Sequence, residues 1–412
     1  MSVAVNRRGR LAARCLPSAF RGCALSDFDG VPTIAQYRAG LARWLDEHGE
    51  ELAPYRGLER PSLEQSIEGD RRLLALLHEA GWNRWGWPVD AGGRGGTAVL
   101  RGALYDQLYA SGYRIAEAML PLETIAPALL AYAPELAARF LPAALRGDEV
   151  WCQGFSEPDA GSDLASLRCR AVDAGDHWVV TGQKIWTSWG HVARRCILLA
   201  RTGPAASAHH GLTMLFADMD SPGVTARPIR AITGRNEFAE VFFAEAPVPK
   251  DRLVGEVDKG WAVAMHLLQW ERGMYAWQRQ AWLHSRLGQL IASASEIRPS
   301  GEERIGEAYE AVFALRARCG DTLRRLAAGE NPGPEISVDK ILLATAEQTV
   351  LDVAREALHP VVEVGTGPES EAWRSEWFFS RAASVYGGAA EIQRTILAER
   401  LLGLPREAER GR

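Results

Sequence analysis

The sequence has few cysteines and no long hydrophobic run. Its six cysteines lie far apart in the chain and form no C-x-x-C pair, which argues against a zinc site and a disulfide framework and favours a reducing compartment such as the cytoplasm. The longest uninterrupted apolar stretch, at about residues 125–133, is far too short to cross a bilayer and contains a proline. We therefore expect a cytoplasmic protein with no metal centre and no membrane span.

An excess of one charge is also lacking, because 47 basic residues stand against 52 acidic ones and the net charge is −5. Such mild acidity gives no reason to expect nucleic acid as a partner. Phosphate-loop, HExxH and GxSxG motifs are missing, and the glycines at 92–96 do not follow a predicted strand, which excludes a Rossmann dinucleotide site. With 412 residues, of which 47% are hydrophobic, the chain has room for two or three globular domains.

The hydrophobic pattern predicts a mainly α protein with a central β domain. We expect a loose tail, an N-terminal helical domain, a β domain built as a small sheet or barrel, and a C-terminal four-helix bundle, over residues 1–26, 27–150, 151–255 and 256–412 respectively. The tail holds five arginines, and Arg14 interrupts its only apolar run. A secretory signal is therefore not expected, and a transit peptide is the alternative to a loose tail.

Each predicted domain carries a local signal. In the first, Asp70 is expected to cap a helix, and a further helix is expected over residues 99–119. In the β domain, residues 178–186 have the pattern of a hairpin with Gly182 in its turn. In the last, apolar residues repeat at i, i+4 and i+7 over 308–323, which predicts the buried seam of a helix bundle.

Two long strings remain that a globular fold does not require. The first is WCQGFSEPDAGSDLASL at 151–167, followed by GQKIWTSWG at 182–190, and the second is SVYGGAAEIQRTILAERLLGLP at 384–405. In this order, and with the helix–strand–helix succession around them, they resemble the acyl-CoA dehydrogenase family over about residues 30–406. The resemblance is strongest to actinobacterial members that act on steroid side chains or on unusual acyl thioesters.

The resemblance implies FAD as the cofactor. Backbone amides and hydroxyls at Phe155, Ser156 and Ser188 suit the polar edge of a flavin ring, and the indole of Trp186 can cover its face. By resemblance, Ser162 lies near the pyrophosphate or the thioester-bearing arm of the substrate. The cofactor-binding residues that the resemblance implies are Gln153, Phe155, Ser156, Ser162, Trp186, Thr187, Ser188, Ala389 and Glu391, the last two standing where the family usually has threonine and glutamine.

The same resemblance implies a catalytic carboxylate. The family's reaction removes an α-proton from an acyl thioester while a hydride leaves the β-carbon, and the base needs apolar surroundings that raise its pKa. Many members carry the base directly after the tyrosine that matches Tyr386, where this chain has Gly387. A second group carries it in a Glu-Arg pair, matched here by Glu271 and Arg272. We expect Glu271 as the base, Arg272 beside it orienting or neutralising the substrate, and the Gly387 N–H as donor to the thioester carbonyl.

Two segments that family members contribute to the cofactor site of a neighbouring subunit match the family pattern poorly in this sequence. An Arg-x-x-Phe-Gly stretch is usual, and Arg298, Ser300 and Gly301 match it only in degenerate form. A Gln-x-x-Gly-Gly string is replaced by HPVVEVG at 359–365. The partners we expect are an acyl-CoA or acyl-carrier thioester and a homodimer, a homotetramer or a heterotetramer with a second acyl-CoA dehydrogenase-like chain. An electron-transfer flavoprotein is a possible oxidant.

The leading hypothesis is an FAD-dependent acyl-CoA dehydrogenase that desaturates an acyl thioester between its α- and β-carbons. One alternative is a non-catalytic or half-site subunit of a heteromeric acyl-CoA dehydrogenase. The other is a flavin oxidase, a monooxygenase or a carrier-protein-bound acyl dehydrogenase on the same scaffold, because a fold does not fix a function.

Overall fold

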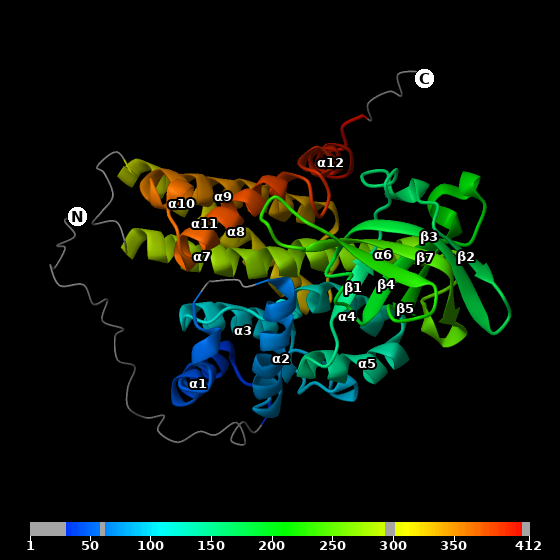
Figure 1. Ribbon diagram of the computed structural model, residues 1–412, viewed down its shortest axis with the longest axis horizontal. Coiled ribbons are helices and arrows are strands. Elements are labelled where there is room, and N and C mark those ends of the chain that lie inside the picture. The colour runs from blue at the N-terminus through cyan, green and yellow to red at the C-terminus, as the bar shows by residue number, and fades with distance from the viewer. Residues whose placement is uncertain (1–29, 58–61, 293–300, 406–412) are drawn as a thin grey trace.

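The computed structural model describes residues 30–57, 62–292 and 301–405. Over these ranges the chain forms helices, then a sheet, then helices again (Figure 1), which confirms the predicted fold class. The expected tail at 1–26, as well as Arg298 and Ser300, lies outside the described residues.

The N-terminal unit consists of α-helices whose buried residues join two cores, one shared with the C-terminal helices and one shared with the sheet. Their bounds are α1 Ile34–Glu47, α2 Leu63–Glu79, α3 Ala98–Ala110, α4 Met119–Tyr132 and α5 Pro134–Arg146. The expectation that Asp70 caps a helix is wrong, because Ser62 caps α2 by accepting a hydrogen bond from the Gln65 N–H. Asp70 lies inside α2, fully buried, and accepts hydrogen bonds from the side chain of Arg114 at 3.2 Å and the N–H of Glu117 at 2.7 Å.

The helix expected over 99–119 also differs from the structure. Helix α3 ends at Ala110, and Gly112 adopts a positive φ of 80° that an α-helix does not allow. The segment between α3 and α4 is therefore not an α-helix. It carries Ile115 and Glu117 to the cavity described below.

The β domain is one mixed sheet with the strand order β6-β7-β3-β2-β4-β5-β8, and β1 pairs with β4. Among the described residues its pairing runs as an open path from β6 to β8 and does not close into a ring. The strands β1–β4 span Trp151–Gly154, Arg170–Asp173, His177–Ser188 and Arg195–Arg201. The strands β5–β8 span Leu212–Asp218, Val224–Ile229, Phe238–Pro249 and Leu253–Val254.

The hairpin expected at Gly182 is wrong. Strand β3 runs through Gly182 as a 12-residue strand antiparallel to β7. A Cβ on Gly182 would lie only 2.6 Å from the Cα of Cys169, so the glycine is required by the close approach of two chain segments and not by a turn.

The C-terminal unit is helical. It comprises α6 Gly260–Trp270, a π-helical turn Glu271–Tyr275, α7 Ala276–Ala292, α8 Gly301–Ala327, α9 Ile336–Ala357, α10 Val361–Val364, α11 Pro368–Ser380, α12 Ala390–Ile396 and a second π-helical turn Leu397–Leu401. The predicted seam is confirmed, because the apolar residues at its repeat positions are all buried: Ala308, Val312, Leu315, Cys319 and Leu323.

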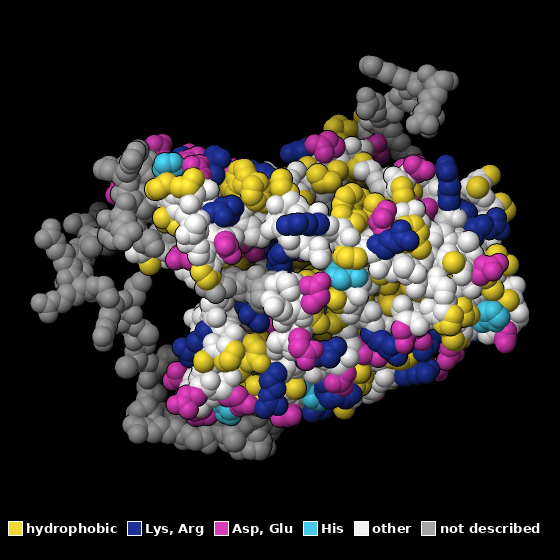
Figure 2. Space-filling view, in the orientation of Figure 1, with side chains coloured by type: hydrophobic (Ala, Val, Ile, Leu, Met, Phe, Trp, Pro, Cys, Tyr) yellow, Lys and Arg dark blue, Asp and Glu magenta, His cyan; other side chains and the backbone are white. Residues whose placement is uncertain are grey.

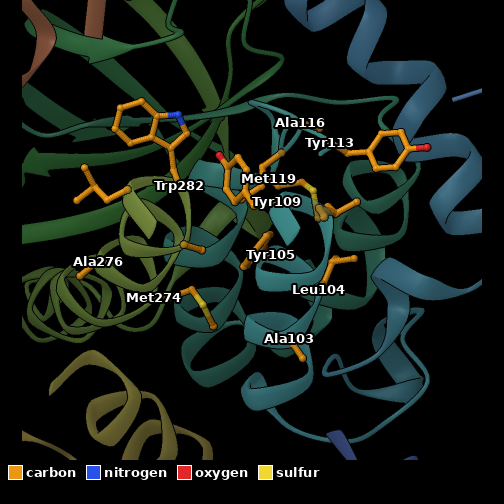
Figure 3. Packing of buried hydrophobic residues seen from close by; sticks show 14 of the residues in the cluster. Ala103, Leu104, Tyr105, Tyr109, Tyr113, Ala116, Met119, Met274, Ala276 and Trp282 are labelled. Carbon is orange, nitrogen blue, oxygen red and sulfur yellow. The ribbon is translucent and has the colours of Figure 1, made fainter. Parts of the chain in front are cut away.

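The three units meet in the middle of the molecule, with α7 running between the N-terminal helices and the rest of the bundle (Figure 1). Figure 3 shows how Tyr105 and Tyr109 of α3 gather with Met119, Met274 and Trp282 in one buried cluster. On the face shown in Figure 2, acidic and basic side chains are interspersed. No helix within the described ranges has both the length and the hydrophobicity that crossing a membrane requires.

Candidate active site

A cavity of about 300 Å³ lies where the three units meet, and each unit contributes to its wall. The N-terminal unit supplies Ile115, Leu120 and Pro121. The sheet supplies residues of the first motif string, and the bundle supplies Glu271 and Gly387. A site of this kind, apolar with a few polar groups and placed between domains, is typical of small-molecule binding.

The sheet side of the cavity contains four of the predicted flavin-lining residues. Phe155 and Ser156 directly follow β1, and Trp186 and Ser188 end β3. The β3–β7 register shifts between Lys184 and Thr187, and Trp186 adopts a positive φ of 59°. Such backbone strain is uncommon for a bulky residue and gathers at functional sites.

Trp186 is also 58% exposed although it lines the cavity. Its ring meets that of Phe238 edge-on, with centroids 6.0 Å apart, so one indole face is left for a ligand. A planar ring with polar edges fits between such an indole and the hydroxyls of Ser156 and Ser188. The residues present on this side therefore fit a flavin.

An ion pair that sequence reasoning missed holds this segment. Lys184, fully buried in β3, donates to the carbonyl of Phe155 at 2.9 Å and to Oε1 of Glu157 at 2.8 Å. Glu157 also accepts from the N–H groups of Arg168 and Cys169 at 2.7 and 2.8 Å. The sequence offered one signal for this ion pair, because Lys184 is one of only four lysines in the chain and stands in a predicted strand.

The bundle side carries the predicted base. Glu271 begins the π-helical turn that joins α6 to α7, and a π turn inside an α-helix often marks a functional site. Burial raises the pKa of Glu271, against the opposing effects of the Arg272 charge, a hydrogen bond from Gln153 and the Lys340 charge. The Gln153 amide donates to Oε2 of Glu271 at 3.4 Å. Gln153, which the resemblance assigned to the cofactor, thus contacts the candidate base.

Gly387 lies against the same carboxylate. Its φ is +62°, and a Cβ at this position would lie 3.0 Å from Oε1 of Glu271 and 3.2 Å from Cε of Lys340. Any larger residue here would press on both side chains while holding a strained backbone. The glycine therefore lets the chain after Tyr386 approach Glu271 closely.

Charged side chains that sequence reasoning missed lie beside this part of the cavity, and Arg279 is part of its wall. Arg279 of α7 forms buried ion pairs with Glu347 of α9 and Glu376 of α11. The Tyr386 hydroxyl donates to Oε2 of Glu347 at 2.6 Å. Lys340 donates to the Ala383 carbonyl, and its Nζ lies 4.4 Å from the Tyr386 ring centroid. Burial lowers the pKa of Lys340 to about 8.

Five predicted residues do not line the cavity. Thr187 is buried, and its hydroxyl has no partner among the described residues. Arg272 is half-buried, its Nε is likewise unpaired within the described chain, and its guanidinium lies near Gly388. Burial lowers the pKa of Arg272. Three others lie in loops or at a helix start: Ser162, which is exposed; Ala389, which precedes α12; and Glu391, which is exposed and 4.0 Å from Arg394.

Known proteins share this architecture and these sequence features. The acyl-CoA dehydrogenase middle-domain model matches residues 152–246, and the acyl-CoA dehydrogenase C-terminal-domain model matches residues 258–402. The acyl-CoA dehydrogenase IpdE1 of Mycobacterium tuberculosis (strain ATCC 25618 / H37Rv) is 38% identical over 384 residues, which cover 91% of this chain and 99% of that relative.

Solved structures are similar over the same length. The Tcur3481-Tcur3483 steroid ACAD aligns with a TM-score of 0.76 and 25% identity over 91% of this chain and 98% of its own. The ChsE4-ChsE5 complex from Mycobacterium tuberculosis has the same fold, with a TM-score of 0.73 and 24% identity over 92% of this chain and 100% of its own. The chain therefore belongs to the acyl-CoA dehydrogenase family, whose members are flavoprotein oxidoreductases.

Proposed function

We propose that this acyl-CoA dehydrogenase desaturates an acyl thioester between the α- and β-carbons, with Glu271 as the base. The observation that carries the proposal is the position of the Glu271 carboxylate, which lines the same cavity as Trp186 and Ser156. Removing a weakly acidic α-proton calls for a carboxylate with a raised pKa, and burial provides it.

FAD is the cofactor we propose, and when bound it accepts the hydride that leaves the β-carbon. Phe155, Ser156 and Ser188 would hold the polar edge of the ring, and Trp186 would cover one face. Thr187, buried between Trp186 and Ser188, would support the flavin segment. The remaining residues that the resemblance assigns to the cofactor lie apart from the cavity, and we propose them for the pyrophosphate and adenosine portions: Ser162, Ala389 and Glu391.

The side chains of this protein would act on the thioester as follows. Gln153 donates to Glu271 and holds the carboxylate in place. Glu271 takes the α-proton. The Gly387 N–H donates to the thioester carbonyl and stabilises the negative charge that develops on its oxygen, while the nearby Arg272 guanidinium adds positive charge.

We further propose that a second acyl-CoA dehydrogenase-like chain completes the cofactor site. The segments that relatives contribute to a neighbouring subunit's cofactor site match the family pattern poorly in this sequence. The motif that would bind the chain's own flavin matches the pattern in full. The ChsE4-ChsE5 structure is a complex of two such chains. A soluble electron-transfer flavoprotein is the oxidant we propose.

Anaerobic mixing with a panel of acyl-CoAs, from short chains to steroid side chains, tests the activity. Bleaching of the flavin absorbance is expected for at least one of them, and no bleaching by any of them in the flavin-loaded protein would contradict the proposal. Mass and flavin content of the chain expressed alone test the heteromer. A full complement of FAD per chain would contradict it.

A further inference from the structure

One face of the helix that carries the candidate base lines the cavity for two turns. Glu271, Tyr275 and Gln278 follow one another at i, i+4 and i+7, and all three line the cavity. Residues at this spacing share one face of a helix. With a rise of 1.5 Å per residue, Gln278 lies roughly 10 Å along the helix from Glu271.

Gln278 has a buried polar side chain whose amide oxygen has no hydrogen bond. The residue is 1% exposed, and the oxygen has no partner among the described residues. The Tyr105 hydroxyl interacts with this amide. Its single proton is donated to Oε1 of Glu123 at 2.5 Å, so the Tyr105 oxygen can only accept from one Gln278 N–H, and the Gln278 oxygen is left without a donor.

The charged groups of the cavity wall have partners instead. Glu117 accepts from Arg235 at 2.7 Å, and Glu237 forms an ion pair with the same arginine at 3.4 Å. Arg279 is paired with Glu347 and Glu376. Gln278 therefore keeps its amide oxygen and one amide N–H for a ligand.

The surroundings of Gln278 make an unmet hydrogen bond costly. Ile115, Leu120, Pro121 and Phe379 supply apolar surface to the same cavity. A buried polar group without a partner costs free energy, and a site built around such a group discriminates against ligands that cannot pair with it. A purely hydrocarbon acyl group would leave the amide oxygen unpaired.

We propose that the cavity is built for an oxygenated acyl group, with a hydroxyl or ketone oxygen that hydrogen-bonds to the side-chain amide of Gln278, two helical turns from Glu271. This inference rests on the proposed function and adds a substrate class to it. The amide donates to either kind of oxygen and also accepts from a hydroxyl. The apolar residues around it contact the carbon skeleton of the same acyl group.

Matched thioesters test the proposal. Cyclohexylpropanoyl-CoA and its analogues with a hydroxyl or a ketone on the ring carbon opposite the side chain differ only at the oxygen. We expect kcat/KM for flavin reduction to favour an oxygenated analogue by about tenfold or more. A preference for the hydroxyl over the ketone would show that the amide oxygen accepts a hydrogen bond as well.

The variant Gln278→Met removes the amide but keeps a side chain of similar size. We expect the ratio of kcat/KM between the oxygenated thioester and its hydrocarbon analogue to fall toward one. The ratio between two substrates is independent of how much of the variant folds or binds flavin. Gln280→Met is the matched control, because Gln280 is buried on the same helix but bonds to Asp106 and Arg316. We expect this control to keep the wild-type ratio.

Calorimetric titration with the same thioesters tests the subsite without turnover, and the expected preference in Kd is in the same direction. Equal kcat/KM and equal Kd within each pair, or a preference that Gln278→Met leaves intact, would overturn the inference. If both members of a pair bleach the flavin equally, only the subsite is wrong. If neither bleaches it although the oxygenated member binds more tightly, the proposed function is wrong and the subsite stands.

Discussion

Oε1 of Glu271 lies 3.0 Å from the point that a Cβ on Gly387 would occupy. Glu271 belongs to the helix that opens the bundle, whereas Gly387 lies more than a hundred residues later, just before α12. If the residue after Tyr386 carried a carboxylate side chain, its Cβ would lie next to the Glu271 carboxylate. The two positions that the resemblance gives for a base therefore converge on one region of this cavity, and in this chain a carboxylate reaches that region from the helix.

The first prediction concerns the base. Replacing Glu271 with glutamine removes the proton acceptor but keeps the size and the hydrogen-bonding capacity. We expect substrate reduction of the flavin to fall by ~10²-fold or more, as measured by anaerobic stopped-flow absorbance, with flavin content unchanged. Reduction at close to the wild-type rate would show that another group takes the proton.

The second prediction concerns Gly387. Gly387→Ala forces a side chain into a φ of +62° and places its Cβ against Glu271 and Lys340. We expect a loss of about 1–3 kcal/mol in unfolding free energy from the backbone strain, together with slower flavin reduction. Gly403→Ala is the control, since Gly403 also has positive φ but a Cβ there meets nothing within 4 Å; it should lose stability without affecting the reduction rate.

The third prediction concerns cofactor retention. Trp186→Ala removes the exposed indole at the cavity, and we expect FAD to bind about fivefold more weakly or worse, since a ring contact contributes about 1 kcal/mol. Fluorescence titration of the deflavinated protein measures the Kd. Trp178→Phe, which changes a buried tryptophan of the same strand, should bind FAD as the wild type does. Equal affinity of the Trp186→Ala protein would remove this residue from the flavin site.

The fourth prediction concerns pH. The proposed base Glu271 can accept a proton only when it is ionised, and burial raises its pKa. We therefore expect kcat/KM to rise with pH along a limb whose midpoint lies above the ordinary pKa range of glutamate. The Lys340 charge lowers the pKa of Glu271, so Lys340→Met should move this limb to still higher pH.

Lys340→Arg keeps the charge and serves as the control for that shift. The other charged groups around Lys340 are Glu347 on its own helix and Arg272 on the π turn, and both variants leave them in place. A Lys340→Met protein with an unshifted limb would show that the lysine acts only through packing.

The fifth prediction concerns the support of the flavin segment. Lys184→Met leaves the buried Glu157 without its cation, and we expect a loss of about 3–5 kcal/mol in unfolding free energy, measured by denaturant titration. The double variant Lys184→Met with Glu157→Leu should recover part of this loss, because no unpaired charge is left buried. An additive or larger loss in the double variant would contradict this account.

Much of the architecture was predictable because local sequence sets it. The apolar repeat over 308–323 and the β domain between two helical units follow directly from which side chains must be buried, and both appear in the structure. The errors arose where packing overrides a local signal. Asp70 has the character of a cap residue but is held inside α2 by Arg114, and Gly182 has the character of a turn but permits a close approach.

The sequence by itself determined the family, the order of the units and the Glu-Arg pair, because these depend on residue identity and spacing along the chain. Only the tertiary structure decided which of those residues share a cavity. It brought Gln153 to Glu271, placed Lys340 next to Gly387 and left the amide oxygen of the buried Gln278 without a partner. Contacts between residues far apart in the chain depend on how three packed units close on one another, and no local pattern records that geometry.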